Sequence, residues 1–363
     1  MAQAITVLPS DLHNETLLSN VHPSEWQNPE PATSYNLVVI GAGTAGLVSA
    51  AAAAGLGAKV ALVEQHLMGG DCLNVGCVPS KAMIRSARAQ ADILKAEAFG
   101  VATASGSSVD FGRVMERLRR LRSGISHHDS VHRFSELGID VFLGEGQFKD
   151  SRSIQVNGQL LRFKKAVIAT GARAANPPIP GLEESGFLTN ETVFSLTELP
   201  RRLLVLGGGP IGCELAQAFS RLGAEVTLVE MGSQFLPRED AEAAEILAQK
   251  MEADGVDIRL ATTLTRVSQD HHEKHAHLST GDVTNGIPVD EILVGVGRVP
   301  NVRGLNLEAA GVEYDRRQGV NINDRLQTTK PRIFAAGDVA LDYKFTHTAD
   351  ATARIVIQNA LFM

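Results

Sequence analysis

Two stretches of the chain run through the same order of apolar and polar positions. The first opens with the apolar, β-branched run "YNLVVIGAG" at 35–43, continues through small residues at 44–57 and ends in a second apolar run, "KVALVE", at 59–64. An apolar run ending in glycines, a helix-length stretch and a further apolar run together predict a strand–helix–strand unit. The two strands of such a unit lie parallel in one sheet.

The second stretch repeats this order in "RRLLVLGGGPIGCELAQAFSRLGAEVTLVE" at 201–230. A whole supersecondary unit that occurs twice indicates two dinucleotide-binding domains rather than a solenoid. The pattern predicts helices at 78–137 and short strands at 139–165. The same reasoning predicts a buried strand that leads into a proline-rich crossover at 165–181, a later buried strand at 331–340 and a helix at 348–362. We therefore predict an α/β fold of two nested Rossmann-like domains with three-layer central parallel sheets.

Both units carry the spacing G-x-G-x-x-G and close on a glutamate. In this arrangement the first glycine permits a tight turn, the second lets the backbone approach a pyrophosphate, and the third lets helix and strand pack closely. The free N–H groups of the following helix attract phosphate, and the acid accepts hydrogen bonds from ribose. The first unit supplies Gly41, Gly43, Gly46 and Glu64, and the second supplies Gly207, Gly209, Gly212 and Glu230.

The residues after Glu230 bear on which nicotinamide cofactor binds. A carboxylate at that position favours a free 2′-hydroxyl, whereas a 2′-phosphate needs a nearby arginine. The next seven residues, "MGSQFLP", contain no Arg or Lys, and the first basic residue is Arg238. The sequence therefore favours NADH over NADPH.

Two of the three cysteines, Cys72 and Cys77, lie five positions apart in "GGDCLNVGCVPSK". Structural zinc sites pair two such clusters, and this chain has no second pair, because Cys213 lies within a dinucleotide turn where a small buried residue fits. Five residues of ideal helix separate the two positions by about 7.5 Å along the axis, which is too far for a disulfide. The backbone must therefore bend at Gly76, and these features favour a constrained pair that opens and closes near a helix N-terminus.

Composition excludes several classes of protein. The 363 residues are 44% hydrophobic and 21% charged, as in globular proteins of more than one domain. A net charge of −7 argues against nucleic acid as a partner, so the basic run at 113–124 is interpreted as a solvated helix face. No signal peptide or membrane-spanning stretch is recognisable, and three cysteines are too few for a secreted disulfide scaffold, so we expect a cytoplasmic protein.

The segment at 69–81 resembles the redox-active disulfide motif of the pyridine nucleotide–disulfide oxidoreductases, which include dihydrolipoamide dehydrogenase, glutathione reductase and mercuric reductase. The resemblance spans about 36–363 and includes both glycine motifs, "ATG" (169–171), "GVGRVPN" (295–301) and "AAGD" (335–338). It is strongest towards the dihydrolipoamide dehydrogenase and mercuric reductase branch. It implies an FAD-dependent enzyme that passes hydride from NADH through FAD to a Cys72–Cys77 disulfide, and on to a small-molecule disulfide or thiophilic acceptor.

The resemblance also assigns residues to roles. Cys77 is similar to the cysteine beside the flavin and Cys72 to the outer thiol that exchanges with substrate, while Lys81 and Glu214 match an ion pair near the reactive edge of the flavin. Glu64 matches the adenosine-ribose ligand and Asp338 the ribityl ligand. The implied FAD site comprises Gly41, Gly43, Gly46, Glu64, Gly70, Asp71, Lys81, Gly146, Thr170, Gly171, Asp338 and Thr346. The implied nicotinamide-cofactor site comprises Gly207, Gly209, Pro210, Ile211, Gly212, Glu230, Val267 and Gly297.

By the same resemblance, residues 36–188 with 316–363 form an FAD domain and 189–315 an NAD(P)H domain. Residues 1–34 contain four prolines and little periodicity, which predicts an extended or partly ordered leader. Family members continue into a C-terminal dimerisation domain with a His–Glu pair, and this chain ends at Met363. We therefore expect that domain to be absent, which argues against the family-type homodimer and against efficient turnover. The N-terminal metal-binding module and C-terminal cysteine pair of mercuric reductases are also expected to be absent.

One further cluster, "DHHEKHAH" at 270–277, raises the question of metal binding. His275 and His277 would share one face of a strand, and His271 could approach them. No cysteine lies nearby in sequence, so we interpret the cluster as an exposed hairpin and predict no metal site. Two alternative functions remain: a diaphorase-type flavoenzyme that reduces a quinone or metal acceptor, and a non-catalytic FAD/NAD-binding module.

Overall fold

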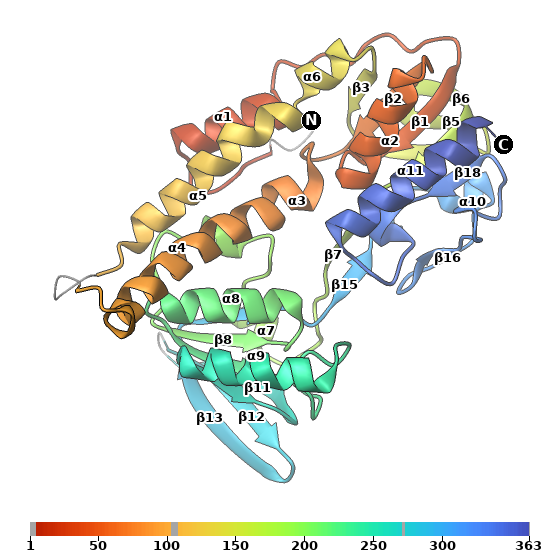
Figure 1. The fold of residues 1–363 in the computed structure, drawn as a ribbon. Coiled ribbons are helices and arrows are strands. Elements are labelled where there is room, and N and C mark those ends of the chain that lie inside the picture. Colours follow the sequence, from red (N-terminus) through yellow and green to blue (C-terminus); the bar gives the residue numbers. More distant parts are fainter. Residues whose placement is uncertain (1–4, 103–107, 271–272, 363) are drawn as a thin grey trace. The chain divides into compact units, whose positions relative to one another are not determined.

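The computed structural model describes residues 5–102, 108–270 and 273–362 (Figure 1). The chain divides into two compact units. Unit 1 comprises Met1–Asn74, Arg122–Arg173 and Arg298–Met363, and unit 2 comprises Val75–Leu121 and Ala174–Gly297. Each unit is described by itself below.

Unit 1 is built on a parallel sheet in the order β3-β2-β1-β6, with β18 on the other side of β6. Helix α2 (Thr44–Gly55) connects β1 to β2, and α11 (Thr346–Phe362) packs on α2. The first half of β6 extends into an antiparallel meander with β4 and β5. The strands are β1 (Tyr35–Ile40), β2 (Val60–Glu64), β3 (Asp140–Leu143), β4 (Gly146–Asp150), β5 (Ser153–Val156), β6 (Gln159–Ile168) and β18 (Ile333–Ala335).

The apolar sequences of β1 and β2 explain why these strands lie inside the sheet of unit 1. All five residues of β2 are buried, and only Asn36 of β1 is partly accessible. Strands that are covered on both faces read as continuous apolar runs rather than as alternating ones, which is the pattern of parallel sheets. The predicted strand–helix–strand unit at 35–64 is thus confirmed.

The remaining elements of unit 1 are short. They are α3 (Gly70–Asn74), η2 (Ser126–Asp129), α6 (Val131–Glu136), β15 (Arg298–Pro300), α10 (Leu307–Ala310), β16 (Tyr314–Asp315), β17 (Gly319–Val320) and η4 (Gly337–Val339). Two elements cross the division between the units, namely α5 (Phe111–Ile125) and β7 (Ala172–Ala174), which pairs with β15.

Unit 2 repeats the design with a parallel sheet in the order β10-β9-β8-β14. Helix α8 (Pro210–Arg221) connects β8 to β9, and α4 (Cys77–Lys95) packs on α8. An antiparallel sheet β11-β12-β13 completes the unit. The other elements are β8 (Arg202–Leu206), β9 (Glu225–Val229), β10 (Val256–Arg259), β11 (Thr262–Asp270), β12 (Glu273–Thr280), β13 (Val283–Val289), β14 (Glu291–Val294), α7 (Leu182–Ser185), α9 (Ala241–Ala253), η1 (Ala96–Phe99) and η3 (Val193–Ser195).

Two features hold unit 2 together. Met83 of α4 and Met115 share one buried cluster with Phe219 of α8. Beside this core, the carboxylate of Asp254 accepts hydrogen bonds from Lys95 at 2.5 Å and from Arg221 at 2.5 and 2.9 Å. Burial opposes ionisation of Asp254, but its two cationic partners outweigh that effect and hold the pKa below its usual value.

The N-terminal segment differs from the extended leader predicted for residues 1–34. Residues Leu12–Val21 form helix α1, and the Asp11 side chain caps it by accepting from the N–H of Asn14 at 2.9 Å. Leu17 and Val21, four residues apart, are completely buried. Residues one helical turn apart lie on the same face, so this apolar pair gives the segment a face to bury against unit 1.

The structural division also differs from the predicted domain boundaries. Residues 75–121 group with unit 2, because α4 and the first part of α5 bury their apolar faces in the core around α8. The unit-1 segment at the C-terminal side begins at Arg298 rather than at residue 316. Two mixed α/β units with parallel sheets nevertheless confirm the predicted fold class.

The histidine cluster lies on an antiparallel hairpin of β11 and β12, as predicted. His275 lies 3.3 Å from Glu273, and His277 lies 2.8 Å from the Ser268 hydroxyl. The predicted approach of His271 lies outside the described residues. Within the described part of the chain, no group of three or more His, Cys, Asp or Glu residues has metal-ligand geometry.

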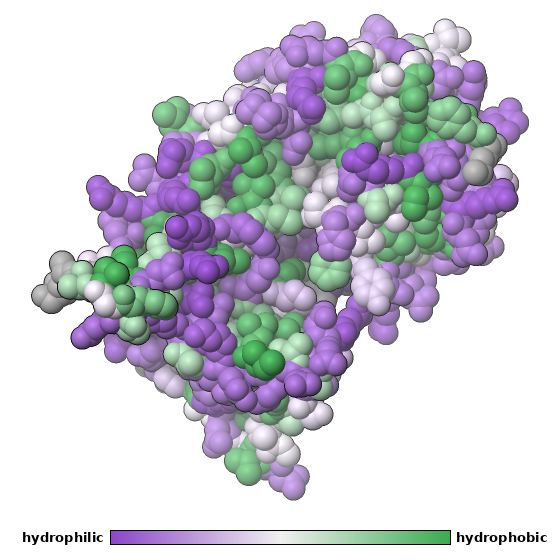
Figure 2. Space-filling model, viewed as in Figure 1, coloured by the Kyte–Doolittle hydropathy of each residue, from purple (hydrophilic) through white to green (hydrophobic). Residues whose placement is uncertain are grey.

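The surface carries polar and apolar residues side by side, as the mixed purple and green of Figure 2 shows. Among residues 5–102, 108–270 and 273–362, no helix is both long and apolar enough to cross a membrane.

Candidate active site

The first glycine turn lies in unit 1 between β1 and α2. Gly41 has φ +99°, and a Cβ there would lie 2.4 Å from the carbonyl oxygen of Ala169. A Cβ on Gly46 would lie 1.7 Å from the carbonyl oxygen of Gly41. Gly43, by contrast, has its nearest neighbour, the Cα of Gly70, at 3.7 Å. The outer two glycines are therefore required by packing, and the middle one leaves the N-terminus of α2 open to a phosphate.

The second turn, in unit 2, has the same construction. Gly207 has φ +102° and would place a Cβ 2.6 Å from the carbonyl oxygen of Gly295, and a Cβ on Gly212 would lie 2.0 Å from the oxygen of Gly207. Around Gly209 nothing lies within 4 Å of a built Cβ. The two turns thus offer equivalent open cradles at the N-termini of α2 and α8.

The two glutamates also take equivalent positions. Glu64 accepts hydrogen bonds from the N–H of Ala42 at 2.6 Å and of His66 at 2.7 Å. Glu230 accepts from Gly208 and Gly232, both at 2.8 Å. Burial raises the pKa of Glu64, although its backbone hydrogen bonds act in the opposite direction. Each carboxylate is held beside its glycine turn, where it can meet a ribose.

In unit 1, a charged cluster joins two of the residues assigned to FAD. Arg298 donates from Nη2 to Asp71 and to the carbonyl oxygen of Ala172, and its Nε lies 3.5 Å from Asp338. Burial raises the pKa of Asp338, while Arg298 and Lys344 act to lower it. The guanidinium therefore offsets the charge of two carboxylates, Asp71 and Asp338, that are 267 positions apart in the chain.

Thr170 and Gly171 are held by a residue that the predicted site did not include. The side-chain amide of Asn301 donates to the carbonyl oxygen of Thr170 at 2.9 Å, and the Thr170 hydroxyl donates to the carbonyl oxygen of Asn301 at 2.8 Å. Both Asn301 and Arg298 belong to the motif "GVGRVPN" at 295–301, so the sequence did single out this segment. It did not indicate their partners, which lie far away along the chain.

The other predicted cofactor positions have varied surroundings. Gly70 has φ +56° and would place a Cβ 2.5 Å from the Cα of Gly43, while Gly146 and Thr346 begin β4 and α11.

In unit 2, Pro210 begins α8, Ile211 is 37% exposed next to it, and Gly297 has φ +125°. Val267 is buried, and its N–H donates to the carbonyl oxygen of Pro180 at 2.9 Å.

The two motif cysteines belong to different helices. Cys72 lies in α3 of unit 1 and Cys77 is the first residue of α4 in unit 2, and both side chains are half-buried. Val75 and Gly76 separate the helices, and Gly76 has φ −134° and ψ −118°. The bend predicted at Gly76 is therefore present, and Pro79 lies in the first turn of α4, where its missing N–H needs no partner.

Lys81 and Glu214 form the predicted ion pair within unit 2. Lys81 Nζ lies 2.8 and 2.6 Å from the two carboxylate oxygens of Glu214, and the side chains are 58% and 41% exposed. The pair lines a cavity of about 200 Å³ between α4 and α8, together with Ile84, Gln217 and Arg221. Lys81 lies one helical turn after Cys77.

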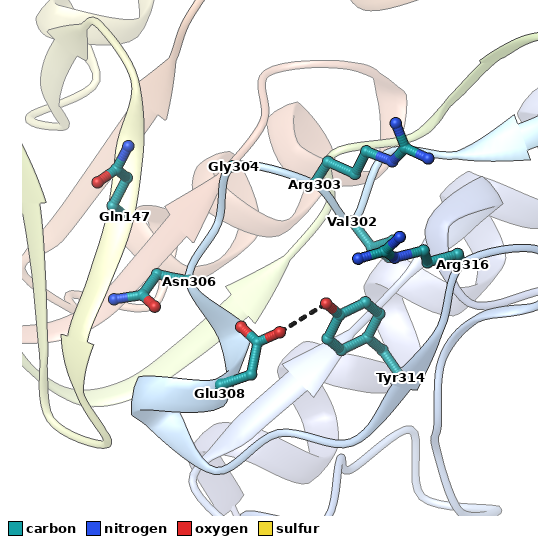
Figure 3. Close-up of a pocket in the computed structure, with 8 residues that line it drawn as sticks. All are labelled: Gln147, Val302, Arg303, Gly304, Asn306, Glu308, Tyr314 and Arg316. Carbon is teal, nitrogen blue, oxygen red and sulfur yellow. Dashed lines mark hydrogen bonds between the residues drawn. The ribbon is translucent and has the colours of Figure 1, made fainter.

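A larger cavity, of about 430 Å³, lies elsewhere in unit 1 (Figure 3). Tyr314 donates there to Glu308 at 2.7 Å, and Arg303 and Arg316 line the same space. None of the predicted site residues lines this cavity.

Comparison with known proteins agrees with the two turns and the cysteine motif. Residues 35–353 match the pattern of the family described as pyridine nucleotide-disulphide oxidoreductase. The chain belongs to this family. The predicted membership is confirmed, and members of this family bind FAD and a pyridine nucleotide.

Relatives in the family carry several names. A mercuric reductase of Staphylococcus aureus is 37% identical over 90% of this chain, and a dihydrolipoyl dehydrogenase of Acholeplasma laidlawii is 33% identical over 90%. The matches cover 60% and 96% of those two proteins, so the chain spans three-fifths of the mercuric reductase's length. A solved structure of the HOCl-induced flavoprotein disulfide reductase RclA from Escherichia coli, a Cu(II) complex, superposes with a TM-score of 0.80. It is 32% identical and the match covers 91% of this chain and 71% of that one.

Proposed function

We propose that this protein is an FAD-dependent NADH:disulfide oxidoreductase that cycles a Cys72–Cys77 disulfide and reduces a small disulfide or a thiophilic acceptor. The observation that carries the proposal is the pair of equivalently built dinucleotide turns in a chain that also contains two cysteines at a helix break. The three cysteines of the chain also support the prediction of a reducing, cytoplasmic location.

The residues of unit 1 fit FAD. The cradle at Gly43 is open where a pyrophosphate would bind, and Glu64 is held where it can accept from the adenosine ribose. Asp338 and Thr170 are the further candidates for flavin contacts. Bound FAD would supply the hydride-accepting ring between the nicotinamide cofactor and the disulfide.

In unit 2, Gly209 and Glu230 would hold the nicotinamide cofactor in the same way. The exposed Ile211 would be covered by it, which explains an apolar side chain at the open N-terminus of α8. Glu230 favours a free 2′-hydroxyl, and the seven residues that follow it contain no Arg or Lys to bind a 2′-phosphate. These features support NADH as the preferred donor.

The thiol step depends on the protein's own residues. Cys77 occupies the N-terminus of the 19-residue helix α4, where the helix dipole and free N–H groups stabilise a thiolate. Cys72, in the short helix α3, is the candidate outer thiol. Lys81 follows Cys77 by one helical turn on α4, and its pairing with Glu214 holds the Lys81 side chain against α8.

Anaerobic titration of the flavin-loaded chain tests the proposal. NADH should deliver about two electrons more to the native chain than to Cys72→Ser, because a disulfide is a two-electron couple. A long-wavelength absorbance band should accompany this step and be absent in Cys77→Ser. Cys213→Ser is the matched control and should behave as the native chain.

The outcomes separate the alternatives. Equal electron uptake by native chain and Cys72→Ser would refute the disulfide mechanism and favour the diaphorase reading. Failure to bind FAD would leave only a nucleotide-binding module. An equal response to NADPH would overturn the cofactor preference while leaving the disulfide mechanism in place.

A further inference from the structure

Helix α1 is connected to the short helix that carries Cys72 through one buried arginine. Arg122 donates from Nη1 to the main-chain oxygen of Asn74 at 2.6 Å and from Nη2 to Oδ1 of Asn14 at 2.7 Å. Asn14 lies in α1 and Asn74 is the last residue of α3. Asn14, Arg122 and Asn74 are 2%, 3% and 4% exposed, so both hydrogen bonds are shielded from water.

The α1 end of this connection is fixed by two residues that precede the helix. The backbone N–H of Asn14 donates to the Asp11 carboxylate at 2.9 Å, and its side-chain amide donates to the carbonyl oxygen of Pro9 at 2.7 Å. Because the amide nitrogen is engaged by Pro9, the amide oxygen is left to accept from Arg122. The hydrogen bond from Nη2 of Arg122 therefore depends on how the start of α1 holds Asn14.

Helix α3 needs such outside support. It has only five residues, and a helix of that length does not persist on its own. The Asn74 side chain donates to the carbonyl oxygens of Met68 at 3.0 Å and Gly70 at 2.9 Å, while Arg122 occupies the main-chain oxygen of Asn74. The N–H of Met68 in turn donates to the carbonyl oxygen of Val21, the last residue of α1, at 3.1 Å. Helix α1 thus supports the Cys72 segment before and after the cysteine.

This support comes from outside the family pattern. The family match begins at residue 35, whereas α1 ends at Val21. The family match therefore does not include α1 and does not assign its connection to the Cys72 helix.

We propose that α1 is a positioning element for the Cys72 thiol and acts through Asn14 and Arg122. The inference rests on the proposed function, because it concerns the Cys72–Cys77 disulfide. A disulfide tolerates only a narrow range of Cα separations, so ring closure is favoured when α3 is already held in place. When the connection is cut, ring closure must also order α3, and the reduced dithiol becomes more favoured.

The test is the redox equilibrium of the two thiols in the full 363-residue chain. Ring closure removes two electrons and two protons from Cys72 and Cys77, and glutathione disulfide accepts them to become two molecules of glutathione. The chain is equilibrated anaerobically at a series of glutathione ratios, alkylated and analysed by peptide mass spectrometry. Asn14→Ala should lower the equilibrium constant for oxidation about tenfold, which corresponds to a potential about 30 mV more positive.

Asn20→Ala is the matched control. Asn20 lies on the same helix and donates to the Ser126 hydroxyl at 2.8 Å. Its loss should lower the melting temperature without moving the potential. Asn14→Asp retains an acceptor oxygen for Arg122 but loses the N–H that donates to Pro9, so it should shift the potential less than Asn14→Ala. Asp11→Ala should make the potential more positive by a smaller amount than Asn14→Ala does. It serves as the test if Asn14→Ala does not fold.

Two results are decisive against the inference and can be told apart. If the native chain forms no Cys72–Cys77 disulfide at any glutathione ratio, the proposed function fails and the inference fails with it. If the disulfide forms but Asn14→Ala and Asp11→Ala keep the native potential, the proposed function stands and only the role of α1 is refuted.

Discussion

Alanine at Gly212 and alanine at Gly209 should have opposite consequences, although both residues belong to one motif. A Cβ on Gly212 would lie 2.0 Å from the carbonyl oxygen of Gly207, about 1 Å inside the closest approach that real Cβ atoms make. That oxygen is backbone, so α8 or the turn must move. Overpacking of this kind costs about 1–3 kcal/mol, and a rigid backbone contact argues for the upper end.

Gly209→Ala meets no such contact. Nothing lies within 4 Å of the built Cβ, and φ of −81° is open to alanine. The variant loses only the preference for glycine over alanine at a helix N-cap, which is below about 1 kcal/mol. The added methyl group instead occupies the space through which the backbone would approach a pyrophosphate.

Two measurements separate these effects. For a unit of this size, about 3 kcal/mol lowers the melting temperature by about 6–12 °C, which scanning calorimetry resolves for Gly212→Ala. Gly209→Ala should keep a near-native melting temperature while its dissociation constant for NADH, measured by calorimetric titration, rises about tenfold or more. The reasoning is refuted if Gly212→Ala melts within about 1 °C of the native chain, or if Gly209→Ala is the less stable variant.

Three further predictions follow from charges and burial in unit 2. Burial raises the pKa of Cys213 to about 12, so at pH 8 iodoacetamide should modify Cys72 and leave Cys213 unmodified in the reduced, folded chain; rapid modification of Cys213 would contradict its burial. Asp254→Asn should lower the free energy of unfolding by about 3 kcal/mol at pH 7, measured by urea denaturation. Because the folded pKa of Asp254 lies below its unfolded value, its stabilising effect is present above about pH 4 and is lost as the pH falls through the folded pKa. The difference in free energy of unfolding between native chain and variant should therefore narrow towards pH 3. A difference that stays constant with pH would count against the ion pairs. Lys81→Met should change stability by less than about 1 kcal/mol, since its pairing with Glu214 is exposed, and a larger loss in urea denaturation would show that the pair is structural.

The parts of the site that sequence could predict are the local ones. The glycine spacing fixed the roles of Gly41 and Gly46, because a positive φ and a close helix–strand approach are demands that one short segment makes on itself. The bend at Gly76 was predictable for the same reason, since five residues of regular helix cannot bring two cysteines together.

What the sequence missed depends on residues that are distant along the chain. Arg298 contacts Asp71 and lies near Asp338, and nothing in the spacing of these three residues indicates that they meet. The leader was predicted to be extended or partly ordered because it contains four prolines and little periodicity. Helix α1 forms there because Leu17 and Val21 are buried against other parts of unit 1, which the sequence of the leader does not indicate.

The sequence by itself determined that this protein has two strand–turn–helix units built to receive dinucleotides, and a bent cysteine segment beside a helix start. These features follow from φ angles, residue size and apolar period, which act over a few residues. Only the tertiary structure decided that Arg122 would connect α1 to the Cys72 helix. A buried guanidinium is stable only where distant donors and acceptors converge on it, and that convergence exists once the chain has folded.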